Sequence, residues 1–145
     1  MRIESVFLLA LMLLVPLTPL VEPTEAVSAR SQPCGGSICI NEVMPNPNGY
    51  DDAVWPNGEW LELHNSGTTS VDVRNWYFSN KAAKTLTLDS NSIVGYDAAN
   101  ASTYTLAPGD YMIVARNGAS NFYVANSNDF MTLYDSSSGW IDEAT

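Results

Sequence analysis

Short runs of alternating apolar and polar residues, separated by turn residues, fill this chain from residue 38 onward. The alternation in ICINEVM (38–44) and EWLELHN (59–65) predicts two strands, and the apolar run YMIVAR (111–116) predicts a buried one. No window after residue 30 has the spacing of an amphipathic helix. The pattern therefore predicts an all-β domain, a sandwich or barrel of short antiparallel strands.

Turn-forming residues predict how these strands connect. Residues 45–58 (PNPNGYDDAVWPNG) contain three prolines and no period, so we expect a long loop. The turn SGTTS predicts a hairpin between the strand 59–65 and a further strand, VDVRNWYFSN (71–80). The turn DSSSG (135–139) predicts a second hairpin near residue 145.

The first 29 residues differ in composition from the rest. Arg2 is followed by an uncharged, mostly apolar run over residues 6–21, and the small residues Val27 and Ala29 suit a signal peptidase. This layout predicts a secretory signal peptide with a helical core, cleaved after Ala29. An uncleaved anchor helix is the alternative, although two prolines interrupt the apolar run.

Export would leave residues 30–37 as a linker and residues 38–145 as the domain, outside the cell or on its surface. Without residues 1–29 the chain has 5 Lys and Arg residues against 13 Asp and Glu, a formal net charge of −8. A domain this acidic repels phosphate backbones, which disfavours direct binding of nucleic acid.

An exported chain can carry two covalent modifications. Cys34 and Cys39, close together in PCGGSIC, predict a disulfide. A metal site built on them would need further soft ligands, and His64 is the only histidine. The NAS triplet at Asn100 predicts a glycan acceptor in a host that glycosylates exported proteins.

The strand 59–65 contains the strongest candidate for catalytic chemistry. Residues two apart share a face of a strand, so Trp60, Glu62 and His64 lie together, and Glu59 lies with the leucines. A glutamate beside a histidine can act as acid and base or hold a metal. The sequence has no HExxH or GxSxG motif to complete such a site. We therefore interpret Glu62 as a half-buried carboxylate that accepts hydrogen bonds from backbone or Asn donors, and we predict no catalytic residue.

The loop 45–58 supplies two further candidates. Asn48, Asp51 and Asp52 are hard oxygen ligands suited to calcium, but their spacing fits no EF-hand, and no other cofactor is expected. Tyr50 and Trp55 suggest a contact surface. The alternative is that these aromatic side chains fold back over the end of the core.

Four stretches in order resemble the lamin-tail domain: INEVMPNP, EWLELHNSGTTSVDVRNWYF, TLAPGDYMIVA and MTLYDSSSGWIDEAT. The resemblance covers residues 38–145 and implies an immunoglobulin-like β-sandwich without catalytic activity. The positions that it carries over are structural or motif positions, namely Asn41, Glu42, Trp60, Glu62, Asn65 and Trp76.

We therefore expect an exported or cell-surface binding module of the lamin-tail type. Its partner would be a protein or an envelope polymer, met by the loops at one end of the sandwich. The alternative is an accessory module of a larger secreted nuclease or hydrolase whose catalytic part lies beyond Thr145. A third interpretation is a building block of the cell surface that assembles on itself.

Overall fold

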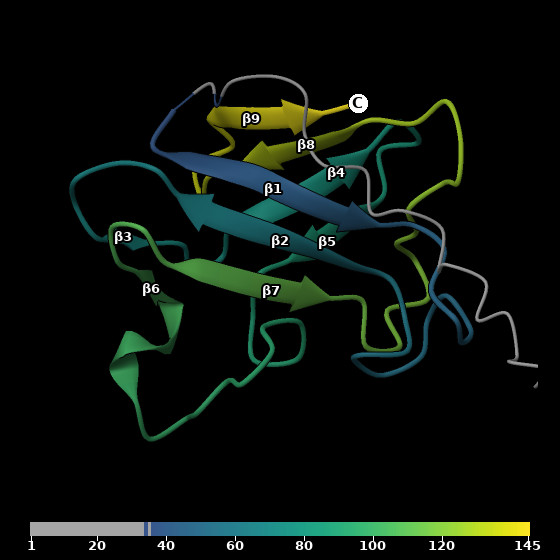
Figure 1. The fold of residues 1–145 in the computed structure, drawn as a ribbon, viewed down its shortest axis with the longest axis horizontal. Helices are drawn as coiled ribbons and strands as arrows, with labels where there is room; N and C mark the ends of the chain where they lie inside the picture. Colours follow the sequence, from purple (N-terminus) through teal and green to yellow (C-terminus); the bar gives the residue numbers. More distant parts are fainter. Residues whose placement is uncertain (1–33, 35) are drawn as a thin grey trace, which may run out of the picture.

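The structure, a computed structural model, describes Cys34 and residues 36–145. The predicted signal peptide and most of the linker lie outside the described residues. Within the described part, the strands form two larger antiparallel sheets and one small one, and the larger sheets face each other as two layers (Figure 1). The fold is an immunoglobulin-like β-sandwich, as predicted. No helix among these residues has the length and hydropathy needed to span a membrane.

The first sheet has the order β1-β2-β7. Its strands are β1 (Ile38–Met44), β2 (Trp60–Asn65) and β7 (Tyr111–Ala115). Strand β2 lies in the centre and alternates as the sequence predicts: Leu61 and Leu63 are fully buried, whereas the side chains between them are half-buried on the outer face. This alternation places one side of the sheet against the core.

The second sheet has the order β5-β4-β8-β9. Its strands are β4 (Tyr77–Asn80), β5 (Thr85–Thr87), β8 (Met131–Tyr134) and β9 (Trp140–Ala144). Two short strands, β3 (Val71–Asp72) and β6 (Thr105–Leu106), form the small sheet, and a 3-10 helix, η1 (Ala101–Tyr104), precedes β6. The predicted closing hairpin is confirmed, since β8 pairs with β9 across the turn at residues 135–139.

The predicted hairpin between residues 59–65 and 71–80 is wrong. Strand β2 pairs with β1 and β7, and the segment 71–80 is two strands, of which β3 pairs with β6 and β4 with β5 and β8. A turn separates them: Asp72 Oδ1 accepts the Arg74 N–H at 2.9 Å, and Asn75 has a φ of 61°. Asx turns and a left-handed Asn interrupt a strand. Here they lead the chain from β3 in the small sheet to β4 in the second large sheet.

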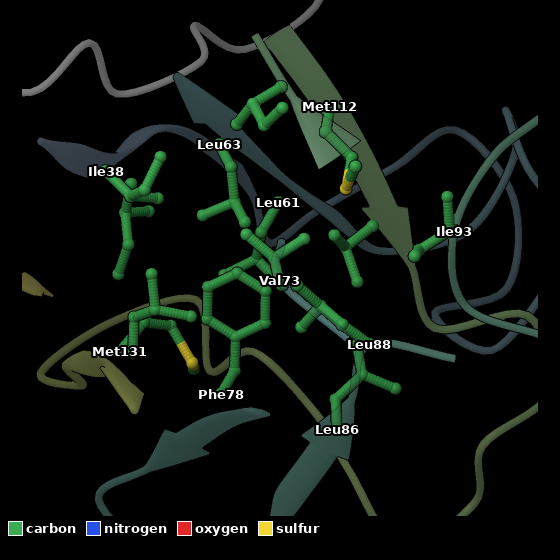
Figure 2. Packing of buried hydrophobic residues seen from close by; sticks show 14 of the residues in the cluster. Ile38, Leu61, Leu63, Val73, Phe78, Leu86, Leu88, Ile93, Met112 and Met131 are labelled. Atoms are coloured by element: carbon green, nitrogen blue, oxygen red, sulfur yellow. The ribbon is translucent and has the colours of Figure 1, made fainter. Parts of the chain in front are cut away.

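The core lies between the two large sheets (Figure 2). Phe78 from β4 projects into its centre, near Leu61 and Val73, and all three are fully buried. The shared core is what joins the two sheets, because burial of apolar surface is the main favourable contribution to folding.

A polar contact joins the two sheets at one edge, where β1 lies beside β9 (Figure 1). The buried carboxylate of Asp142 in β9 accepts the backbone N–H of Ile40 in β1 at 2.9 Å. The register of β1 against β2 shifts between Ile40 and Glu42. A bulge of this kind turns a backbone group away from its own sheet, and here that group finds its partner in the other sheet.

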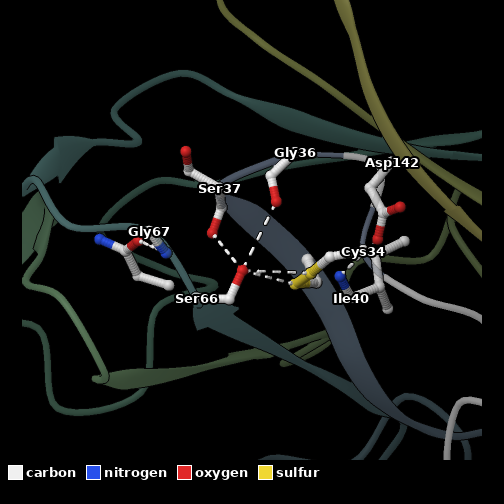
Figure 3. The surroundings of a disulfide bond; sticks show 9 residues. Cys34, Gly36, Ser37, Ile40, Ser66, Gly67 and Asp142 are labelled. Carbon is white, nitrogen blue, oxygen red and sulfur yellow. Dashed lines mark hydrogen bonds between the residues drawn. A yellow bond between two sulfur atoms is a disulfide. The ribbon is translucent and has the colours of Figure 1, made fainter.

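The predicted disulfide between Cys34 and Cys39 is confirmed, with the two Cα atoms 5.4 Å apart. It closes a small loop at the start of β1 (Figure 3). The hydroxyl of Ser66, which follows β2, lies 3.5 Å from Cys34 Sγ and 3.7 Å from Cys39 Sγ. The disulfide thus joins the segment before β1 to β1 itself, and its sulfur atoms lie beside the turn after β2.

Reduction of this disulfide should lower the free energy of unfolding by about 2 kcal/mol, because so short a loop restricts the unfolded chain only modestly. Urea unfolding of the oxidised chain with and without dithiothreitol measures the difference. The Cys34→Ser/Cys39→Ser variant is the control and should not respond to the reductant. Free thiols in the purified chain before reduction would contradict the assignment.

Candidate functional site

The loop 45–58, which joins β1 to β2, has a defined conformation. The Glu59 N–H donates to Asp51 O at 2.8 Å and closes the loop at its base. The Trp55 N–H donates to Asn117 Oδ1 at 2.9 Å, which connects the loop to the turn after β7. Because side-chain and backbone bonds fix it at several points, the loop can present side chains in a preset arrangement.

A buried ion pair lies beneath this loop. Glu59 is 1% exposed and Arg116 is 9% exposed, and Arg116 Nη1 lies 3.0 Å from Glu59 Oε2. The Arg116 Nε–H donates to Ala119 O at 2.8 Å, and the Arg116 backbone N–H donates to Glu59 O at 3.0 Å. A buried charge is tolerated only with such partners, so each residue of the pair depends on the other.

Burial raises the pKa of the Glu59 carboxyl from its ordinary value of 4.5 to about 7. The backbone N–H of Val124 and the Arg116 guanidinium oppose the shift, because both favour the charged carboxylate. The desolvation cost of the carboxylate exceeds these gains. Glu59 and Arg116 therefore form a fully charged ion pair only at pH values above the pKa of Glu59.

The aromatic residues of the loop have two different environments. Tyr50 is 86% exposed, and Val54, near it in the loop, is 69% exposed. Trp55 is instead half-buried, with its ring edge-on to the Trp60 ring at a centroid distance of 5.5 Å. Tyr50 thus projects from the molecule, whereas Trp55 folds back over the outer face of β2.

The remaining polar side chains of β2 are used in contacts within the domain. Asn41 Nδ2 donates to Glu62 Oε1 at 2.7 Å, which supplies the Asn donor expected for this carboxylate. His64 stacks on Tyr111, with ring centroids 4.4 Å apart and an interplanar angle of 17°. Glu42 lies opposite Glu62 in the register of β1 and β2. The Asn41–Glu62 hydrogen bond and the His64–Tyr111 stack link neighbouring strands on the outer face, whereas the opposed carboxylates of Glu42 and Glu62 repel each other.

The candidate calcium ligands Asn48, Asp51 and Asp52 all have exposed side chains in the loop. In the described part of the chain, no three or more His, Cys, Asp or Glu residues are grouped so as to hold a metal ion. Calcium binding by the loop stays a prediction. Glycosylation of Asn100 also stays a prediction; this residue is exposed and caps η1, with its Oδ1 accepting the Ser102 N–H at 3.0 Å.

Two motif positions have structural contacts. Asn65 is fully buried, and its Nδ2 donates to Thr69 O and Leu106 O, both at 2.8 Å, while its Oδ1 accepts the Gly67 N–H at 3.0 Å. Asn65 therefore builds the turn after β2 and connects it to β6. Trp76 is partly buried and packs against the core from the residue before β4.

The sequence interpretation missed Arg116 and Asp142. In the sequence pattern Arg116 is only the last residue of an apolar strand, and Asp142 is only a residue of the closing hairpin. For Arg116 the signal is weak, because a basic residue after a buried run is usually exposed and needs a carboxylate partner only when it is buried. No comparable signal identifies Asp142, because its partner is a backbone N–H that a strand bulge exposes.

The raised pKa of Glu59 predicts that the domain becomes less stable as the pH rises from about 4.5 to about 7. In that window the folded chain holds a proton that the unfolded chain has lost, so stability falls with pH and levels off above 7. Across this pH interval the free energy of unfolding should fall by at most about 3 kcal/mol. Urea unfolding at pH 5, 6, 7 and 8 measures it, against Glu59→Gln as the matched control without this titration. Parallel pH curves for the two proteins would contradict the assignment.

Replacement of Asn65 should destabilise the fold strongly. Asn65→Ala leaves two backbone carbonyls and one N–H without partners and should cost about 3 kcal/mol. Asn65→Asp keeps the acceptor for the Gly67 N–H but loses both donors, so it should also be destabilising. Chemical unfolding measures both, and Thr68→Ala, exposed in the same turn, should change stability by less than about 0.5 kcal/mol. Asn65→Ala unfolding like this control would contradict the structural role.

Comparison with known proteins agrees with this architecture. A search of curated proteins found no match. The family model of the lamin tail domain matches residues 31–145, which include every strand and the motif positions in β1 and β2. Since the match spans most of the chain and the described residues form an immunoglobulin-like sandwich, the chain belongs to the lamin tail domain family.

Proposed function

We propose that this domain is a non-catalytic binding module of an exported or cell-surface protein, and that the loop 45–58 contacts its partner. The partner is a protein or an envelope polymer. The observation that carries the proposal is the exposure of Tyr50 and Val54, at 86% and 69%, on a loop whose base is bonded to the sandwich. Aromatic residues that protrude from a preorganised loop are typical of binding hot spots.

The polar contacts around the loop support a binding role over a catalytic one. Glu59 is engaged beneath the loop by Arg116, and Glu62 accepts a hydrogen bond from Asn41. These carboxylates therefore maintain the shape of the surface. Export of the module rests on the leader predicted in residues 1–29, and the acidic charge of the domain disfavours nucleic acid as the partner.

Removal of the two exposed side chains should weaken binding while leaving the fold intact. In a pull-down with isolated envelope from the native host, Tyr50→Ser/Val54→Ser should be retained about tenfold less than the unmodified chain, as expected for loss of a hot spot. Tyr50→Phe should retain most of the binding if the ring provides the contact.

The matched control is Trp140→Ser, which removes an exposed aromatic side chain from β9 in the other large sheet. Its retention should equal that of the unmodified chain. Equal retention of the loop variant, or no retention of the unmodified chain on any envelope fraction, would refute the proposed role of the loop.

A further inference from the structure

The outer edge of β7 is only partly covered. β7 is an edge strand of the first sheet, and its C-terminal half is met by the chain's own segment 92–94. The Val94 N–H donates to Ile113 O at 3.0 Å, and the Ala115 N–H donates to Ser92 O at 2.7 Å. Ile93 forms an antiparallel bridge with Val114. This segment therefore pairs with β7 as a very short added strand.

The N-terminal half of the same edge has no such partner. Backbone groups alternate in direction along a strand, so the edge that carries Ile113 O and Ala115 N–H also carries the N–H and C=O of Tyr111. Among the described residues, no backbone hydrogen bond from outside the sheet reaches Tyr111. An open edge of this kind is a template for an additional strand.

A groove of about 400 Å³ lies beside this open edge. Tyr111 and Ile113 line it on the β7 side, and Tyr111 is 57% exposed. The charged residues of its lining are Asp97 and Asp110, both with exposed side chains, and no Lys or Arg of the described part of the chain lines it. The groove thus combines unpaired backbone groups, apolar surface and negative charge.

The two carboxylates remain available for a ligand. Asp97 uses its Oδ1 to accept the Ala99 N–H at 2.9 Å, a local turn contact. Within the described residues neither Asp97 nor Asp110 forms an ion pair with a Lys or Arg side chain. A cationic side chain on a bound segment would therefore find two uncompensated carboxylates.

We propose that the open edge of β7 at Tyr111 binds an extended, basic segment of another protein by β-strand addition. The backbone of the segment pairs with Tyr111 and extends the short strand that residues 92–94 begin. A Lys or Arg side chain of the segment lies in the groove with Asp97 and Asp110. Main-chain pairing provides the affinity and the acidic groove provides the selectivity, as in other cases of strand addition.

This surface is separate from the loop 45–58. Tyr111 pairs with His64 at one end of β2, whereas the loop enters β2 at Trp60. These two positions are four residue steps apart along the strand, a distance of about 13 Å. The proposal therefore does not rest on the role of the loop, and the loop variant serves as a control for this surface.

The probe is a set of short acetylated peptides with alternating Val and Thr, in which one position is varied through all residues. Binding to the full chain is followed by fluorescence anisotropy, and the amides of Tyr111 and Ile113 are followed by NMR. Peptides with Lys or Arg should bind best and should weaken as salt is raised. N-methylation of the peptide on one edge should abolish binding, because it removes the paired donors.

Two variants test the two components of the site. Tyr111→Pro removes the outward N–H and should abolish peptide binding. An edge strand tolerates proline at a position whose N–H has no partner in the sheet. Asp97→Asn/Asp110→Asn keeps the shape of two exposed side chains and should weaken binding of the Lys and Arg peptides about fivefold. The double variant keeps the proposal testable even if Tyr111→Pro does not fold.

The loop variant Tyr50→Ser/Val54→Ser should bind the peptides as the unmodified chain does, which separates failure of this site from failure of the loop. Three results would overturn the proposal. One is the absence of amide shifts at Tyr111 and Ile113 with any peptide at millimolar concentration. Another is equal binding of Glu and Lys peptides. The third is a dimer of the unmodified chain in analytical sedimentation that is absent in Tyr111→Pro. That result would show that the edge pairs with a second copy of the chain.

Discussion

The ion pair between Glu59 and Arg116 is the constraint on which one end of the molecule depends. It lies where the loop 45–58 enters β2 and where the chain leaves β7, and the backbones of the two residues are also hydrogen-bonded. Burial of two charges at this point requires the surrounding loops to exclude water while still supplying hydrogen bonds. The loop and the turn after β7 thus share a common base. Replacement of either residue of the pair therefore affects both the loop and the turn.

The outer and inner faces of the first sheet have different roles. The inner face contributes leucines to the common core, and the outer face carries the aromatic and polar side chains of the family motif. On the outer face Trp60 supports Trp55, and His64 supports Tyr111. The central strand therefore stabilises both exposed regions, the loop at one end and the free strand edge at the other, through side-chain contacts on one surface.

Local patterns identified most of the strands but not the way in which they pair. The alternation of residues 38–44 and 59–65 predicted β1 and β2 because one face of each is buried. The turn at Asn75 was missed because a left-handed Asn looks like any other polar residue in a strand pattern. Pairing partners such as β7 for β2 are distant in sequence, so local patterning cannot indicate them. The same holds for Glu59 and Arg116, whose contact exists only after the sheet has formed.

The bond between Asp142 and Ile40 has a mechanical consequence. It connects the first strand to the last, and Figure 1 shows β1 and β9 side by side with their arrows pointing the same way. Tension applied between Ile38 and Ala144 would act along both strands. The two strands would then have to slide past each other, and the contacts between them would break together and not one after another. Such a load shears β1 against β9, and extension has to break the bond between the Asp142 carboxylate and the Ile40 N–H.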